Sequence, residues 1–269
     1  MLNLFEKKEA PAGIRQSAFI CRRDGLTIRG TEYRPEGENL PIAVVCHGFM
    51  AYADTVRQYA IALAQMGYAA YCFDFCGGSV AMGKSDGKTT DMSVLTEVED
   101  LKAVIAFAKA QPYTGDAGLT LMGCSQGGFV CALTGAAEQT GAQRLILFFP
   151  ALCIPDNARE GRMLKAKFDP ANVPETFFCG PMRLGRRYPM DVMDMDAFEA
   201  IAGFEGDVLI VHGTADRIVD IAYSERALEV YRRTARSAQL VRMDGAGHIF
   251  SRAQDAEAIA HIRAFAAKT

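Results

Sequence analysis

Predominantly apolar runs alternate with longer segments whose apolar residues recur at helical spacing, and this alternation covers most of the chain. Runs typical of strands buried on both faces of a sheet lie at 42–46, 69–75, 119–122, 145–149, 207–212 and 239–243. Helical patterns lie at 54–66, 94–110, 129–137, 222–232 and 253–266. This alternation predicts an α/β fold in which helices cover both faces of a mostly parallel sheet.

The first two predicted strands depart from the parallel rule. Ser17–Arg22 and Leu26–Tyr33 are rich in β-forming residues, and Asp24–Gly25 between them is a strong hairpin signal. With this antiparallel hairpin the sheet reaches about eight strands. Asp54 and Ser93 are placed to cap the two helices that follow them.

The segment 151–203 interrupts the alternation of strands and helices. It holds five of the ten prolines and five of the twelve methionines, so it is not a regular strand–helix unit. We expect one core domain built from 1–150 and 204–269, with 151–203 inserted as a lid. A packing appendage that does not touch the substrate is the alternative.

Composition excludes several classes of protein. With 269 residues, 50% of them hydrophobic and 23% charged, the chain can bury a sizeable core. A net charge of -3 gives no basic field for nucleic acid or an anionic membrane, and no apolar run is long enough to insert into a bilayer. Met1–Glu9 carries acidic residues and no long apolar segment, so we expect a cytoplasmic protein without a secretory signal.

The eight cysteines do not indicate disulfides or a metal site. Several lie in apolar or tight-turn segments, among them Cys46, Cys72, Cys124 and Cys131, and no Cys-x-x-Cys pair occurs. We predict free, mostly buried thiols, and no metal or organic cofactor.

The motif Gly123-Cys124-Ser125-Gln126-Gly127 stands between the apolar run 119–122 and a helical pattern. A strand, a sharp turn and a helix in this order strain the central residue and lift its side chain above the sheet. Glycine is needed at both ends of the motif because a Cβ there would collide with neighbouring backbone. Ser125 is therefore the candidate nucleophile. Cys124 is not, because the protruding position of the turn is the third.

A serine nucleophile needs a base within hydrogen-bond reach and an acid that orients the base. Asp216 follows the predicted strand 207–212, and His248 lies in the loop after 239–243. The order Ser125, Asp216, His248 is the one that α/β hydrolases use. A cap of the last helix is the structural alternative for His248.

The other histidines and aspartates fit these two roles less well. His47 is expected to shape its turn, His212 to pack at a strand end, and His261 to lie on the last helix. The rival acids are Asp220, which suits a helix start, Asp207, at the wrong end of its strand, Asp244, and Asp74, which precedes the serine.

An oxyanion hole requires backbone N–H groups aimed at the developing negative charge. We expect one from Gln126, directly after the nucleophile, and one from Phe49, in the loop after 42–46. Gly48 lets that loop approach the serine closely.

These motifs give the chain a strong resemblance to the α/β hydrolases over nearly its whole length. The residues that carry it are His47-Gly48-Phe49, Gly123 to Gly128, His212 to Asp216 and Gly245 to His248. More narrowly, the chain resembles the bacterial cinnamoyl (feruloyl) esterases. The stretches that carry this second likeness are Phe73-Asp74-Phe75, Gly83 to Gly87, Met92 to Glu97 and Ser125 to Gly128.

The narrower resemblance implies that the insertion covers an acyl pocket, where an aspartate and a tyrosine contact the ring hydroxyl of a hydroxycinnamoyl group. By position, Asp156 and Tyr188 match these two residues, although a turn residue and a packing residue are the alternatives. The resemblance also implies a homodimer. The chain departs from the family in its longer 76–82 loop and in an insertion rich in Met and Arg.

Together these features predict a serine carboxylesterase that acts on a small-molecule ester through an acyl-enzyme, with a hydroxycinnamoyl ester as the favoured substrate. The alternatives are a short-chain acyl esterase or monoacylglycerol lipase-like enzyme, a serine peptidase, and a non-catalytic binding protein with a hydrolase fold.

Overall fold

The structure is a computed structural model that describes residues 10–137 and 140–267. The expectation for Met1–Glu9 lies outside these residues. An eight-stranded sheet forms the centre of the molecule, with the strand order β1-β2-β4-β3-β5-β6-β11-β12. The strands are β1 (Arg15–Arg23), β2 (Leu26–Arg34), β3 (Leu40–Cys46), β4 (Ala69–Phe73), β5 (Thr114–Cys124), β6 (Ala142–Phe148), β11 (Asp207–Gly213) and β12 (Ser237–Met243).

The sheet is mostly parallel, as predicted. β1 and β2 pair antiparallel, β2 pairs antiparallel with β4, and all other neighbours are parallel. The Asp24–Gly25 turn that joins the hairpin has positive φ at both residues. Because the remaining strands are parallel, their carboxyl ends meet at one edge of the sheet, where the loops that carry the candidate residues begin.

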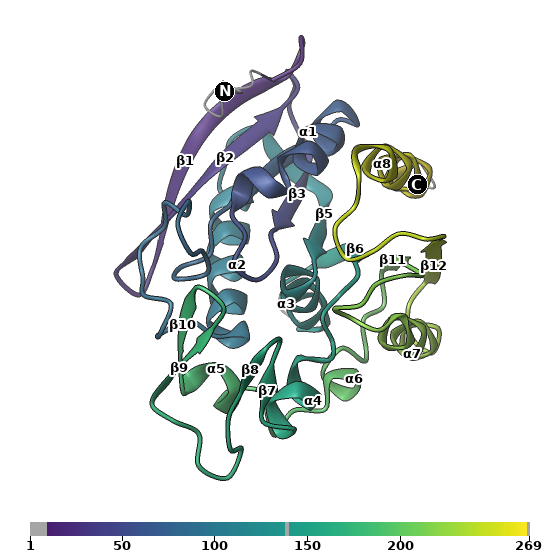
Figure 1. Ribbon diagram of the computed structural model, residues 1–269. Helices are drawn as coiled ribbons and strands as arrows, with labels where there is room; N and C mark the ends of the chain where they lie inside the picture. The colour runs from purple at the N-terminus through teal and green to yellow at the C-terminus, as the bar shows by residue number, and fades with distance from the viewer. Residues whose placement is uncertain (1–9, 138–139, 268–269) are drawn as a thin grey trace, which may run out of the picture.

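Helices cover both faces of the sheet (Figure 1). The long helices are α1 (Arg57–Gln65), α2 (Val94–Lys109), α3 (Gln126–Ala136), α7 (Ile221–Tyr231) and α8 (Arg252–Ala266). Successive strand residues face opposite sides, so Val44 packs in the cluster under α2, α3 and α7, and Val45 packs in the cluster under α1 and α8. This explains why the strands are continuous apolar runs.

One predicted helix start is confirmed and one is wrong. Ser93 caps α2 in a reciprocal capping box with Thr96. Asp54 does not cap α1. It lies in a 3-10 turn, Ala53–Thr55, and α1 begins after Val56 without a side-chain cap. The Asp74 carboxylate accepts the N–H of Ala53 at 2.7 Å, which holds the turn in place and delays the start of the helix.

The segment 151–203 forms short elements that gather on the side of the molecule away from α1 and α8 (Figure 1). They are α4 (Ile154–Arg159), β7 (Arg162–Met163), β8 (Ala166–Lys167), β9 (Thr176–Cys179), β10 (Met182–Gly185), α5 (Arg187–Met190) and α6 (Ala197–Ala200). β7–β8 and β9–β10 are small antiparallel pairs outside the main sheet. The role of this segment as a lid stays a prediction.

Two further features concern the whole chain. All eight cysteines are free thiols, and every one except the half-buried Cys21 is buried, as predicted. None of the helices in the described ranges has the length and apolar composition needed to span a bilayer.

Candidate active site

Ser125 lies at the sharp turn between β5 and α3, and its backbone is strained. It adopts φ 54° and ψ −119°, a conformation that residues with a Cβ rarely take. A Cβ added at Gly123 would lie 2.1 Å from the carbonyl oxygen of Gly127, and one at Gly127 would lie 2.3 Å from that of His47. Both glycines are therefore needed to hold the turn, as the motif predicted.

The structure brings Ser125, His248 and Asp216 together. His248 Nε2 lies 3.0 Å from Ser125 Oγ, and His248 Nδ1 lies 2.7 Å from Asp216 Oδ2. Since a carboxylate only accepts hydrogen bonds, His248 donates from Nδ1, and Nε2 is left to accept the serine proton. The imidazole also packs on Phe149, with 4.7 Å between the ring centroids.

The side chain of Asp216 is fully buried, and its carboxylate has four hydrogen-bond partners. Its Oδ1 accepts the N–H groups of Ile218 at 2.8 Å and Val219 at 3.1 Å, and its Oδ2 lies 3.3 Å from His212 Nε2 as well as beside His248. Burial raises the pKa of Asp216, but the hydrogen bonds from His212, His248 and the backbone outweigh it. The pKa lies well below the ordinary aspartate value, so the carboxylate stays ionised.

His212 has a closer relation to the site than the sequence predicted. It is buried at the end of β11, as expected, where Nε2 donates to the carbonyl of Val219 at 3.0 Å and Nδ1 lies 2.6 Å from Ser224 Oγ. The contact with Asp216 was missed. The available signal was the short spacing in His-Gly-Thr-Ala-Asp: Asp216 is only four residues after His212, so a turn at the end of the strand can bring the two side chains together.

The rival acids have other partners. Asp220 caps α7 by accepting the N–H of Ala222 at 2.9 Å. Asp207 binds Arg236 and Ser237 at the far end of β11, and Asp244 accepts from Thr214 Oγ1 at 3.2 Å. Asp74 joins two loops through Ala53 and the N–H of Lys84. His47 is buried and accepts the N–H of Phe75 at 3.2 Å, consistent with shaping its turn.

The two expected oxyanion donors flank Ser125. Gln126 is the first residue of α3, and Phe49 lines the same pocket as Ser125. A Cβ at Gly48 would lie 3.2 Å from Ser125 Cβ, so this loop passes as close to the serine as expected. Within the described ranges, neither backbone N–H has a protein acceptor. Both are available for a developing negative charge.

An apolar pocket of about 260 Å³ opens at Ser125. Ala151, Cys153, Ile154 and Met163 from the insertion line one part of it, and Ile218, Val219 and Ile249 line another. Ile249 is 88% exposed, so the mouth is apolar as well. This cavity suits a hydrophobic acyl or alcohol group next to the serine.

Besides Ser125, Gln126 and His248, the pocket is lined by one more polar residue, Asn157, which sequence reasoning did not single out. It is buried on α4, its Nδ2 contacts Cys153 Sγ at 3.6 Å, and its Oδ1 has no hydrogen-bond partner. A buried carbonyl oxygen without a partner is costly, and it is free to accept a donor from a bound molecule.

Asp156 and Tyr188 are not among the residues that line the pocket. The carboxylate of Asp156 binds Arg159 and accepts from Tyr223 Oη at 2.6 Å, because α4 turns this side chain away from the cavity and Asn157 toward it. The hydroxyl of Tyr188 is buried and donates to Gln126 Oε1 at 2.6 Å. This arrangement does not support the expected contact of either residue with a ring hydroxyl.

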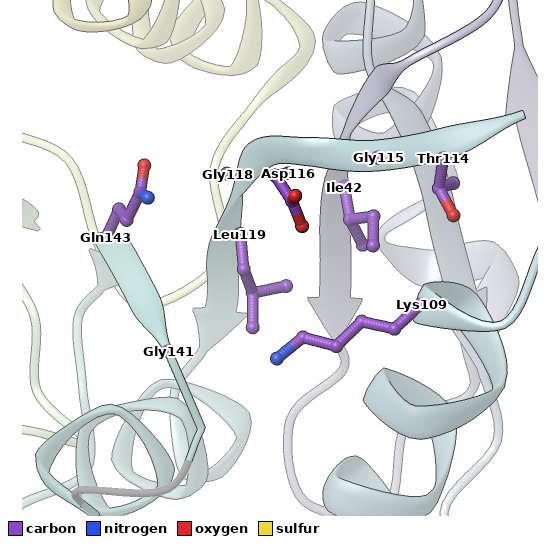
Figure 2. Close-up of a pocket in the computed structure, with 9 residues that line it drawn as sticks. All are labelled: Ile42, Lys109, Thr114, Gly115, Asp116, Gly118, Leu119, Gly141 and Gln143. Carbon is purple, nitrogen blue, oxygen red and sulfur yellow. The ribbon is translucent and has the colours of Figure 1, made fainter.

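A second hollow, of about 460 Å³, lies at the opposite end of the sheet, where β3, β5 and β6 begin (Figure 2). Its charged groups are Lys109, whose Nζ donates to the carbonyl of Thr140 at 2.8 Å, and the exposed Asp116. None of its lining residues is a serine, cysteine or histidine. Nor do the described residues contain a cluster of three His, Cys, Asp or Glu side chains that would hold a metal ion.

Comparison with known proteins agrees with this fold. The family described as serine aminopeptidase, S33 matches residues 37–178, more than half of the chain. The search of curated protein sequences found no match to this chain.

Several solved structures share the fold. Est1E from Butyrivibrio proteoclasticus, solved with ferulic acid bound, has a TM-score of 0.83 and 25% identity, over 93% of this chain and 100% of that one. The hypothetical protein PA2218 from Pseudomonas aeruginosa has a TM-score of 0.75 and 17% identity, over 97% and 95%. The Pyrococcus furiosus esterase Pf2001 has a TM-score of 0.68 and 17% identity, over 94% and 91%. The predicted α/β-hydrolase fold is thereby confirmed.

Proposed function

The chain belongs to the serine aminopeptidase S33 family of α/β hydrolases, and from this premise we propose that it is a serine carboxylesterase that acts through an acyl-enzyme. The hydrogen-bonded series Ser125–His248–Asp216, set on a strained turn at the floor of an apolar pocket, is the observation that carries the proposal. A nucleophile, a base and an orienting acid in this geometry are the requirements for acyl transfer by serine.

The proposed reaction has two halves. Ser125 Oγ attacks the ester carbonyl while His248 Nε2 takes its proton, and the N–H groups of Phe49 and Gln126 stabilise the oxyanion. The tetrahedral intermediate collapses, and His248 gives the proton to the departing alcohol. Water then attacks the acyl-enzyme in the same way, with His248 as base, to release the acid and restore Ser125.

We favour a hydroxycinnamoyl group as the acyl part. The wall of the pocket is apolar, which suits an aromatic ring, and the unpartnered Oδ1 of Asn157 is its one buried acceptor in need of a donor such as a ring hydroxyl. The structural likeness to Est1E, whose complex contains ferulic acid, supports the same substrate class.

Peptidase activity is the main competing proposal, because the family name includes aminopeptidases. An aminopeptidase must neutralise the α-ammonium group of its substrate. The described residues that line the pocket include no aspartate or glutamate, and the buried Asp216 is already committed to two histidines. An uncharged acyl group fits these surroundings better.

A panel of substrates tests the reaction and its specificity together. We expect methyl p-coumarate to be hydrolysed faster than methyl cinnamate, which lacks only the ring hydroxyl, and both to exceed a peptide p-nitroanilide. A preference for long-chain monoacylglycerols or p-nitrophenyl butyrate would favour the lipase-like or short-chain alternatives. Faster cleavage of the anilide would favour a peptidase.

Two matched pairs of variants assign the roles of the residues. Ser125→Ala should remove nearly all turnover and labelling by a fluorophosphonate, while Ser17→Ala on the exposed β1 should change neither. Asn157→Leu should reduce the p-coumarate preference by about 10- to 100-fold, the range for a buried hydrogen bond lost. Asp156→Asn should leave that preference unchanged. A fully active Ser125→Ala would refute the proposal.

A further inference from the structure

A buried chain of hydrogen bonds passes through the side chain of Gln126. Its Nε2 donates to Glu97 Oε2 at 2.8 Å, and its Oε1 accepts from Tyr188 Oη at 2.6 Å. All three side chains are almost completely buried. The carbonyl-type oxygen of the Glu97 carboxyl accepts from Nε2 whether or not the group carries a proton, and the Tyr188 phenol donates to Oε1, so the two partners also set which way the amide points.

The three residues come from three different parts of the chain. Glu97 lies in the first turn of α2, Gln126 begins α3 directly after the nucleophile, and Tyr188 lies in α5 of the insertion. The ring of Tyr188 also packs against that of Phe49, with 5.6 Å between centroids. One tyrosine of the insertion therefore contacts both residues whose N–H groups are the proposed oxyanion donors.

Helix α5, which carries Tyr188, is itself bonded to the core of the protein. Asp191, which ends α5, accepts a hydrogen bond from Ser93, the cap residue of α2. At the start of α5, a Cβ added to Gly185 would lie 1.9 Å from the carbonyl oxygen of Thr90, so backbone meets backbone there. These contacts hold the chain on both sides of Tyr188 against the start of α2 and the loop that precedes it.

We propose that Tyr188 and Glu97 are positioning residues that hold Gln126 and its backbone N–H in the geometry needed to stabilise the oxyanion. The amide is held at one end by Glu97 of α2 and at the other by Tyr188 of α5, so the Gln126 side chain cannot rotate while both bonds are present. The insertion thus contributes to the chemical step and does more than cover the acyl group. This inference rests on the proposed esterase function.

The role predicts a specific kinetic signature. Oxyanion stabilisation acts in the transition state and not in the bound substrate, so its loss lowers kcat and leaves KM nearly unchanged. Removing a whole oxyanion donor costs about 10²–10³ in kcat. Loosening one donor should cost less, and we expect about a tenfold fall in kcat for Tyr188→Phe, which keeps the ring against Phe49.

The matched control is Tyr223→Phe. Tyr223 also donates one hydrogen bond between the core and the insertion, to Asp156 Oδ2 at 2.6 Å, but it does not touch Gln126. We expect this variant to retain kcat within twofold. Glu97→Gln keeps an acceptor for Gln126 and should stay close to wild type, whereas Glu97→Leu should resemble Tyr188→Phe.

A trifluoromethyl ketone provides a readout that a purely structural role would not move. Ser125 Oγ adds to the ketone carbon, the C=O electron pair becomes an oxyanion, and the serine proton passes to His248. For Tyr188→Phe the inhibition constant should rise by the same factor by which kcat/KM falls, while inhibition by the free product acid should not change.

The outcomes separate this inference from the function on which it rests. If wild type hydrolyses esters and Tyr188→Phe raises KM only for substrates with a ring hydroxyl, Tyr188 contacts the substrate and the inference is wrong. It is also wrong if Tyr188→Phe and Tyr223→Phe lose kcat equally. If wild type is neither labelled by a fluorophosphonate nor active on any ester, it is the proposed esterase function that fails.

Discussion

The backbone of Ser125 links catalysis to a local cost in stability. A non-glycine residue in this region of φ and ψ costs of order 1–3 kcal/mol, and here the surrounding glycines and strand ends impose it. The serine is kept because its hydroxyl must protrude toward His248. Stability and function therefore compete at this residue.

Glycine at position 125 should relieve the strain that alanine retains. Both Ser125→Gly and Ser125→Ala lack the nucleophile, and we expect the glycine variant to be more stable by about 1 kcal/mol. Glycine removes the backbone strain at the positive φ, and this gain exceeds the larger loss of backbone entropy that glycine undergoes on folding. Urea unfolding of the two variants measures the difference. Equal midpoints would mean that the turn carries no strain.

At the scale of elements, the start of α2 serves two purposes. The hydroxyl of Ser93 accepts the N–H of Thr96 as a helix cap and donates to Asp191 of the insertion. A side chain in this position couples the stability of a core helix to the placement of α5, and through α5 to Tyr188.

Ser93→Ala should lower both stability and kcat. Loss of the cap costs about 1 kcal/mol, and release of α5 loosens Tyr188, so we expect a several-fold lower kcat with a small change in KM. The control is Asp196→Ala, which removes the cap of α6 within the same insertion without touching α2. A similar loss of stability with unchanged kcat is expected there, and equal kcat losses in the two variants would contradict the coupling.

The sequence predicted those elements whose local pattern agrees with their tertiary surroundings. The buried strands, the hairpin turn and the Ser93 cap each follow from local residues. The Asp54 cap was wrong because the distant Asp74 holds that turn. For Tyr188 the resemblance implies a substrate contact by position alone, and the insertion has no periodic pattern that would indicate which way the ring points. The hydrogen bond of its hydroxyl to Gln126 depends on tertiary packing, which the local sequence does not encode.

At the scale of the whole molecule, the buried Glu97 makes stability depend on pH. Burial raises the pKa of this carboxyl well above its ordinary value, which the hydrogen bond from Gln126 only partly offsets. The folded chain then keeps a proton that the unfolded chain releases. Stability is full below the unfolded pKa of about 4.3 and declines as pH rises toward the folded value, by at most about 1.4 kcal/mol per pH unit for one group.

Glu97→Gln removes this titration and keeps the hydrogen-bond acceptor. The free energy of unfolding of Glu97→Gln minus that of wild type should therefore increase as pH rises from 5 to 8. Because the other titrating groups are the same in both proteins, their contributions cancel in this difference. Urea unfolding at several pH values measures the gap. A gap that stays constant between pH 5 and pH 8 would show that the folded chain already holds Glu97 ionised at pH 5.

The buried free thiols allow local unfolding of the chain to be measured. Burial raises the pKa of Cys72 to about 12 and that of Cys153 to about 11, so neither forms the thiolate that reacts with disulfide reagents at neutral pH. Only Cys21 is even partly accessible, and its pKa is raised to about 11. The rate at which Ellman's reagent reacts with these thiols should therefore measure how often the surrounding structure unfolds locally. The order in which the eight cysteines react would show which layer of the protein unfolds first.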